Sequence, residues 1–401
     1  MPQSSGSQTA ALKAVQVPGV PFELNLAPGS AGQVEIVRAV DAVAPGELHK
    51  LTELGVTATG DGGLPGPSVR AVLDDEAVLG AQLRPQLGIE ITDLAQVPTV
   101  LGTIATDGTF TEMPELTGEL ARLSGANPDD LYFEPQDATV HGDWVLWKEG
   151  SAGEHGAMPT LDFDDWRIVG WNKANGEVQE FGAAFLLHGE RFAPRASWSA
   201  APSTDGQDIY YEAKVPSQLI PGSAGDQWAS AILRVPLGEP GAVEVVAPGT
   251  LPFADQVSPG SYWVNDNGVL VRNGTEVMEV LTAGWQIGSV VATSEIVTVV
   301  VVQGESPAWL LVLDAATLQL RAAIETGADW SEVSASAASV AWGNGTANSD
   351  PQMYLWQLGD VAPTRLGSTQ GMSKPIIGGN LLSVPELTEF GAVVWSLQRI
   401  E

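Results

Sequence analysis

The side chains best suited to chemistry are grouped in one polar stretch, residues 148–166, with the sequence KEGSAGEHGAMPTLDFDDW. Its candidate binding residues are Glu154, His155, Asp162, Asp164, Asp165 and Trp166. The Asp-x-Asp-Asp spacing suits a hard, oxygen-seeking cation, so Asp162, Asp164 and Asp165 are candidate calcium ligands. The same carboxylates could instead act as acid and base on a sugar that stacks on the tryptophan. A third interpretation is a solvated acidic loop, because the whole chain is acidic.

A second long polar stretch, residues 213–228, has the sequence AKVPSQLIPGSAGDQW and adds Asp226 and Trp228 to the candidates. Loops on a rigid scaffold are where binding residues concentrate. We expect these two loops to lie side by side on one face of the fold. They would form a wall beside a ligand or a partner.

Bulky residues recur just before most of the predicted repeats begin. They are Phe133, Phe192, Phe253, Trp285, Trp330 and Met372. One interpretation is a ring of stacking surfaces for sugar rings or a cationic group, which makes Trp285 and Trp330 candidate ligand-binding residues. The other is packing between neighbouring repeats, and their regular spacing favours it.

Motifs of the common enzyme classes are absent from the sequence. There is no G-x-S-x-G elbow, no H-E-x-x-H helix, no P-loop and no dinucleotide fingerprint. The chain has no cysteine and four histidines, which excludes thiolate chemistry and argues against a multi-histidine metal centre. We therefore expect a protein that is not an enzyme, and no cofactor unless calcium binds.

The elements that would position these residues repeat with a period of 45 positions, from Trp285 to Trp330. Each copy shows four short apolar strands separated by Gly-rich or acidic turns. A period of about 40–45 residues with four strands is typical of a β-propeller blade. The sequence predicts an all-β, seven-bladed propeller over residues 21–401 as a single domain, after a flexible linker at 1–20. Six or eight blades are alternatives.

Two features interrupt the regular pattern. Residues 105–130 follow four strands predicted between Ser68 and Ile104, and apolar residues at helical spacing predict one short helix near 114–125. The last blade has three strands, so we expect the spare strands at 21–38 to close the ring. Deletion of residues 1–40 is then expected to collapse the fold.

The third repeat, ASWSAAPSTDGQDIYY, carries a Trp-Ser pair, an Asp-Gly turn and an apolar β pair. The matching positions are Trp198, Ser199, Asp205, Gly206, Ile209 and Tyr210. This repeat resembles those of TolB-type and WD40-like propellers. The resemblance implies a propeller superfold and no catalytic residue.

The formal net charge of −31 repels phosphate backbones and anionic lipid headgroups, which argues against nucleic-acid binding and membrane-surface binding. No apolar run is long enough for a spanning helix. We expect a non-catalytic scaffold for a protein or glycan partner, exported or tethered at a bacterial cell surface by a segment outside this sequence. A cytoplasmic location is also compatible with a chain that lacks cysteine. The alternative function is a glycan-active hydrolase or lyase that uses the carboxylates of 148–166.

Overall fold

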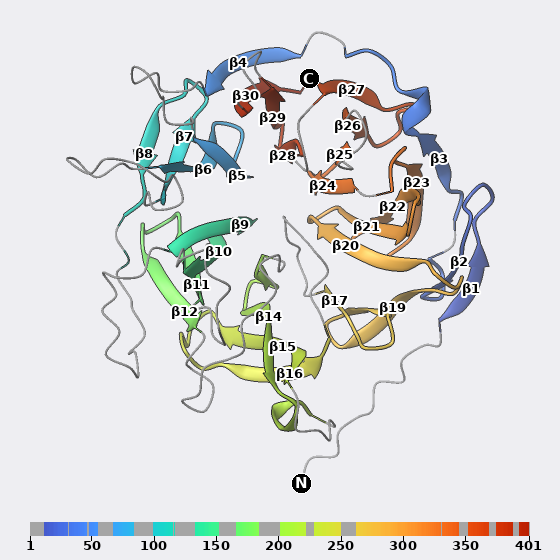
Figure 1. Cartoon of the computed structure of the whole chain (residues 1–401), viewed down its shortest axis with the longest axis horizontal. Coiled ribbons are helices and arrows are strands. Elements are labelled where there is room, and N and C mark those ends of the chain that lie inside the picture. Colours follow the sequence, from blue (N-terminus) through green and yellow to red (C-terminus); the bar gives the residue numbers. More distant parts are fainter. Residues whose placement is uncertain are drawn as a thin grey trace.

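Seven β-sheets stand around a central axis as the blades of a propeller, which confirms the predicted fold (Figure 1). The computed structural model describes residues 12–30, 32–45, 48–54, 67–83, 99–114, 116, 133–151, 166–183, 201–221, 228–249, 262–329, 331–344, 352–368, 374–387 and 393–400. Helices among these residues are single 3-10 turns, none long and apolar enough to cross a membrane. Most of the predicted helix at 114–125 lies outside the described residues.

The first three blades contain four described strands each. Blade one consists of β5 (Ser68–Val72), β6 (Ala77–Leu83), β7 (Thr99–Ala105) and β8 (Phe110–Glu112). Blade two consists of β9 (Phe133–His141), β10 (Trp144–Ser151), β11 (Trp166–Asn172) and β12 (Val178–Ala183). Blade three consists of β13 (Ser203–Thr204), β14 (Asp208–Pro216), β15 (Trp228–Pro236) and β16 (Glu244–Pro248), with η4 (Ser217–Leu219) after β14.

The remaining blades follow in chain order. Blade four contains β17 (Tyr262–Val264), β18 (Leu270–Arg272) and β19 (Thr275–Val280). Blade five contains β20 (Gln286–Ala292), β21 (Ile296–Gln303), β22 (Ser306–Asp314) and β23 (Leu320–Glu325). Blade six contains β24 (Ser331–Ala335), β25 (Ser339–Asn344), β26 (Gln352–Gln357) and β27 (Thr364–Ser368). Blade seven contains β28 (Ile376–Gly378), β29 (Leu381–Leu387) and β30 (Val393–Arg399).

The N-terminal segment 12–54 runs along the outer edges of blades four to seven, and we call it the belt (Figure 1). Its elements are β1 (Lys13–Gln16), β2 (Glu23–Leu26), β3 (Glu35–Arg38), η1 (Ala39–Asp41) and β4 (His49–Leu54). β2 pairs with β19 of blade four, β3 runs parallel to β23 of blade five, and Val43 bridges Thr364 at the edge of blade six.

The belt closes the ring with a different strand from the one expected. β4 pairs with β30 and supplies the outer strand of blade seven, so the closure by an N-terminal strand is confirmed. The prediction that 21–38 supplies this strand is wrong, because β2 and β3 cover blades four and five instead. β1 lies within the predicted linker, and Val17 and Val20 beside it are buried.

Strand assignments differ from expectation in three other places. The strand predicted at 97–104 is the third of blade one, and β8 is its fourth strand. The strand expected at 88–94 lies outside the described residues. The predicted loops 148–166 and 213–228 are shorter than expected, because β10 continues to Ser151 and β14 to Pro216.

The hydrophobic core lies in the seams between blades. At the seam between blades five and six, Val300 and Leu310 pack with Val340, Trp342 and Trp356. A strand that has a blade on each side must be apolar on both faces. The unbroken run IVTVVVV of β21 is buried along its whole length for this reason.

Short polar side chains fix several corners of the blades. The Asp205 carboxylate accepts hydrogen bonds from the backbone N–H groups of Gln207 and Asp208. Gly206, between Asp205 and Gln207, has a φ of 89°. Glycine adopts a positive φ without the steric cost that a Cβ brings, so the Asp-Gly pair marks a hairpin corner as predicted. Asp74, Asp107 and Asp314 accept backbone N–H groups in the same way.

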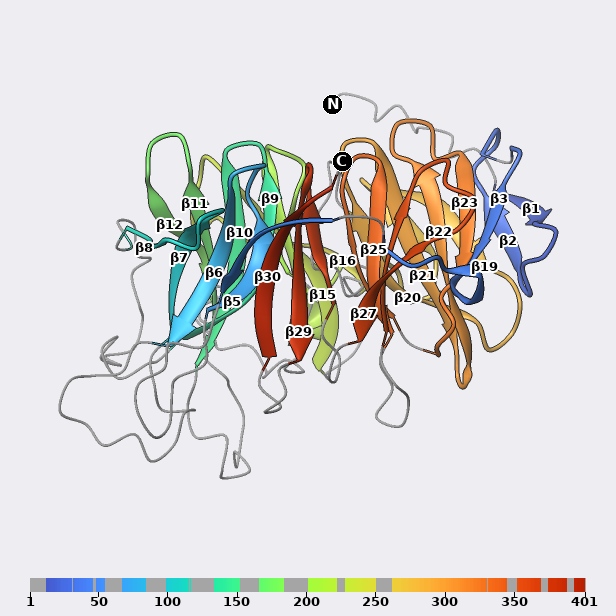
Figure 2. The same cartoon turned by 90° about the horizontal axis from the view of Figure 1, so that it is seen from above.

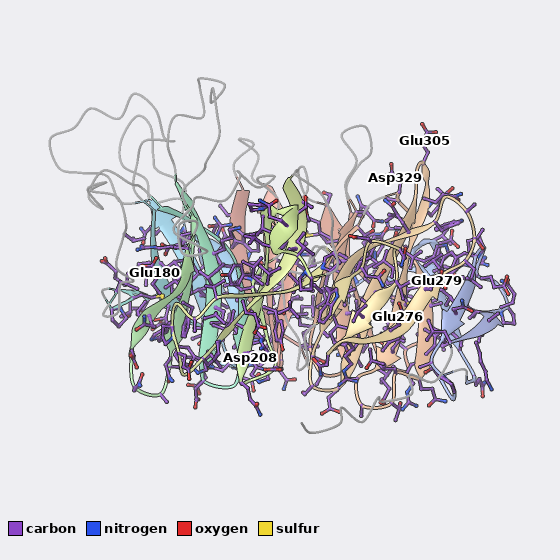
Figure 3. The ribbon with its side chains drawn as sticks, turned by 90° about the horizontal axis from the view of Figure 1, so that it is seen from below. Glu180, Asp208, Glu276, Glu279, Glu305 and Asp329 are labelled. Atoms are coloured by element: carbon purple, nitrogen blue, oxygen red, sulfur yellow. The ribbon has the colours of Figure 1, made fainter. Side chains whose placement is uncertain are left out.

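The two faces of the ring differ. The chain joins second to third strands, and one blade to the next, at the face where Glu305 and Asp329 lie (Figure 3), which we call the loop face. The opposite face, the turn face, carries tight turns such as those between β9 and β10 and between β11 and β12 (Figure 2). Residues 152–165 lie in the chain between β10 and β11, and residues 222–227 lie between β14 and β15. The facing ends of these four strands lie at the loop face.

Neighbouring blades are also joined by buried hydroxyl groups on their innermost strands. The Ser334 hydroxyl donates to the Pro375 carbonyl (2.7 Å) and accepts from the Ile377 N–H (3.2 Å), which links blade six to blade seven. Thr139 donates to the Pro202 carbonyl (2.9 Å) and links blade two to blade three in the same way.

Replacing Ser334 by alanine is expected to lower the free energy of unfolding by about 2–3 kcal/mol, because two buried backbone groups lose their partner. Urea denaturation followed by tryptophan fluorescence measures this loss. The control is Ser306→Ala, whose hydroxyl makes one long contact of 3.5 Å in a surface turn. Equal stability of the two variants would contradict the proposed link.

Candidate ligand-binding groove

The candidate residues taken from the sequence fall mostly on undescribed segments. Those outside the described residues are Glu154, His155, Asp162, Asp164, Asp165, Asp226 and Trp330. Trp166 and Trp228 are the first residues of β11 and β15, where their backbones pair with Gly150 and Pro216. The two tryptophans therefore begin equivalent strands in neighbouring blades, at the loop face.

A buried charged pair lies in blade two next to the first of these segments. Glu149 accepts a hydrogen bond from the Trp147 indole (2.8 Å) and another from Arg167 Nε (2.5 Å). The side chains of Glu149 and Arg167 are 11% and 15% exposed. Both carboxylate oxygens of Glu149 are thus engaged, and the pair ties β10 to β11 where residues 152–165 depart.

Trp285 packs against the belt. Its ring centroid lies 4.8 Å from that of Phe22, and Phe22 meets Trp309 edge-on at 6.4 Å. The same tryptophan contributes to the lining of a hollow of about 480 Å³ beneath Gly19, Val20 and Pro21. Of the two interpretations of the aromatic repeat, packing is the one that Trp285 supports.

A larger hollow of about 670 Å³ lies at the seam between blades three and four, and we call it the groove. Its lining residues are Asp205, Tyr210, Arg234, Val246, Ala247, Pro248, Trp263, Asn265, Val271, Asn273, Gly274 and Glu276. Tyr210 and Trp263 form its floor, with stacked rings 6.5 Å apart at an interplanar angle of 24°. Alternation along β14 aims Tyr211 into blade two, which leaves Tyr210 facing blade four.

Polar side chains surround this aromatic floor. Arg234, 38% exposed, donates to Glu244 (2.5 Å) and lies 3.5 Å from Asp208. The hydrogen bond to Glu244 raises the pKa of the Arg234 guanidinium above its usual range. On the other wall, Asn265 Nδ2 donates to Glu276 Oε1 (3.2 Å).

The groove offers hydrogen-bond donors and acceptors above an apolar floor. Its lining residues include no histidine, cysteine, serine or threonine, and the Tyr210 hydroxyl donates to the Asp205 carboxylate (3.4 Å). Within the described ranges, no group of three His, Asp or Glu side chains could hold a metal ion. The groove therefore presents carboxylate, amide and guanidinium groups to a ligand.

Sequence reasoning missed the groove because its walls come from two blades. In the sequence, Asp205 belongs to the Asp-Gly turn and Tyr210 to the apolar β pair of the third repeat, and Trp263 belongs to no motif. A useful indication was the Tyr210-Tyr211 pair, since adjacent aromatic residues on a strand must face opposite seams.

The fold and the groove together define a seven-bladed β-propeller with a hollow between two blades. No protein-family model matches the chain, and no curated protein matches it either.

The chain resembles solved structures whose names differ from one another. The oligogalacturonate lyase of Vibrio parahaemolyticus matches with 9% identity, 96% of both chains and a TM-score of 0.47. The β-propeller domain of the trilobed protease from Pyrococcus furiosus has 8% identity, with 83% of this chain and 92% of that one covered (TM-score 0.45). TolB from Acinetobacter baumannii has 10% identity, with 75% of this chain and 59% of TolB covered (TM-score 0.36). The predicted propeller superfold is confirmed by the seven sheets of the structure itself.

Proposed function

We propose that the chain is a non-catalytic binding module that holds a neutral, hydroxyl-rich ligand, such as a short stretch of glycan, in the groove. The observation that supports this best is the lining itself, in which Asp205, Arg234, Asn265 and Glu276 stand around the Tyr210–Trp263 floor. Sugar hydroxyl groups each donate and accept, so they need neighbours of both kinds. Carboxylates and amide oxygens accept, and guanidinium and amide nitrogens donate.

The size of the groove also supports a small ligand. Its volume of about 670 Å³ lies within the range of roughly 300–1,000 Å³ that is usual for small-molecule sites. Two charged side chains of its walls already have partners, because Arg234 binds Glu244 outside the lining and Glu276 accepts a hydrogen bond from Asn265. A neutral ligand can therefore bind without leaving a buried charge unpaired, which would be costly.

The loop face is the second part of the proposal. This face carries the ends of β10, β11, β14 and β15 that flank residues 152–165 and 222–227, on a ring that the belt braces from outside, and we infer that it suits docking of a protein partner. We propose an exported or cell-surface setting, where glycans are abundant. We further propose that Asp162, Asp164 and Asp165 are the ligands of an optional calcium ion.

Isothermal titration with a panel of neutral cello-, malto- and chito-oligosaccharides tests the groove. Glu276→Gln is expected to weaken binding about fivefold, because a charged acceptor is worth ~1 kcal/mol more than a neutral one. The matched control is Glu279→Gln on the same strand, whose carboxylate accepts from Asn25 outside the groove (2.7 Å) (Figure 3).

Two outcomes would overturn the proposal. Binding that is absent from the whole panel, or equally strong in both variants, would exclude the groove as a sugar site. Shortening of the oligosaccharides during incubation would favour the alternative, a glycan hydrolase or lyase that uses the carboxylates of 148–166.

A further inference from the structure

Arg70 occupies an unusual position on the innermost strand of blade one. It is the middle residue of β5, and the pairing of β5 with β6 shifts at this point, because Val69 faces Gly80 and Ala71 faces Leu79. Arg70 is thus the extra residue of a β-bulge, a device that redirects one side chain away from the regular alternation.

The neighbours of Arg70 show from which side solvent reaches it. Val69 packs into the seam with blade seven, and Ala71 packs into the seam with blade two. Both are buried, whereas Arg70 keeps partial exposure. Since β5 is the strand of its sheet nearest the axis (Figure 1), the open side of Arg70 is the inner wall of the ring.

The guanidinium of Arg70 also lacks the partners that other arginines have. Its Nε is buried, and no acceptor lies within hydrogen-bond distance in the described part of the chain. By contrast, Arg167, Arg234 and Arg321 each bind a carboxylate. Asp and Glu outnumber Lys and Arg by 49 to 18 in this sequence, so an unpaired arginine is not explained by a shortage of acids.

A buried guanidinium Nε without a hydrogen-bond partner costs stability, so Arg70 calls for an explanation other than a stabilising contact at this atom. We propose that Arg70 binds the anionic group of a ligand, a carboxylate or a phosphate, at the inner wall of the ring. The planar guanidinium can donate two parallel hydrogen bonds to such a group. This site is separate from the groove at blades three and four, and it does not depend on the glycan proposal.

Titration calorimetry with sodium acetate, succinate and inorganic phosphate, at ionic strength held constant with NaCl, tests this site and separates the two anion classes. Arg70→Gln is expected to weaken binding of the preferred anion about tenfold, and Arg70→Lys to restore part of it, because lysine keeps the charge without the fork. The control is Lys13→Gln, which removes one positive charge on β1 at the outer edge. Binding that is absent, or equal in Arg70→Gln and Lys13→Gln, would overturn the proposal.

A second measurement needs no ligand. Arg70→Met keeps an unbranched apolar stem and removes the charge, so in an anion-free buffer it is expected to raise the Tm of the protein. A lower Tm would mean that Arg70 stabilises the blade, and the proposal would then be wrong. A failure of the oligosaccharide titration would leave this result unaffected, so the two proposals can fail separately.

Discussion

Deleting residues 1–40 is expected to abolish the cooperative thermal unfolding of the protein. The deletion removes β1, β2 and β3, which cover blades four and five, and it leaves β4 in place on blade seven. Phe22, Leu24 and Leu26 belong to the same buried cluster as Trp285 and Trp309, so the deletion exposes a wide apolar surface. Each buried side chain of this size contributes about 1.5–3 kcal/mol, against a total stability of ~5–15 kcal/mol for a typical domain.

Circular dichroism melting and binding of a hydrophobic dye measure the outcome of this deletion. The truncated chain is expected to melt without a sharp transition and to bind the dye, because Trp285 and Trp309 lose their cover. Adding a synthetic peptide of residues 12–40 is expected to restore the transition, since this segment pairs with blades four and five through β2 and β3. A truncated chain with the Tm of the parent would show that the belt is dispensable.

The sequence predicts the ring and not the course of the belt, for a reason that lies in β4. The residues HKLTEL show little alternation, and Leu54 is the one fully buried side chain of this strand. ELNL of β2 and EIVR of β3 look like better strands by their apolar content. Closure is decided by which segment meets the free edge of β30, a tertiary contact that local patterns do not contain.

The repeat itself can be predicted from the sequence because its physical causes are local. A strand between two blades must be largely apolar, as β21 is apart from Thr298 and the terminal Gln303, and a tight corner needs a short polar side chain or a glycine, as at Asp205 and Gly206. The groove cannot be predicted from local sequence patterns. It combines Arg234 of β15 with Asn265 and Glu276 of blade four, and neither blade alone carries a motif.

Part of the acidic character of the chain has a structural use. Asp74, Asp107, Asp205 and Asp314 hold the corners of their blades by accepting backbone N–H groups. At Asp314, hydrogen bonds from Arg321 and Thr317 hold the pKa of the carboxyl well below its usual range. A negative charge this widespread is compatible with an ordinary acidic surface, so the acidic stretch 148–166 needs evidence beyond its charge before it is called a site.

Replacing Phe22 by alanine is expected to cost about 3–5 kcal/mol of unfolding free energy, the largest loss from a single belt residue. Phe22 is fully buried and fills the space between the rings of Trp285 and Trp309, so alanine leaves a cavity that rigid indoles cannot close. Urea denaturation followed by tryptophan fluorescence measures the loss. Val40→Ala is the control, since Val40 lies in the same belt with 81% exposure and is expected to change stability by less than about 0.5 kcal/mol. Similar losses in the two variants would mean that the belt lies on the ring without stabilising it.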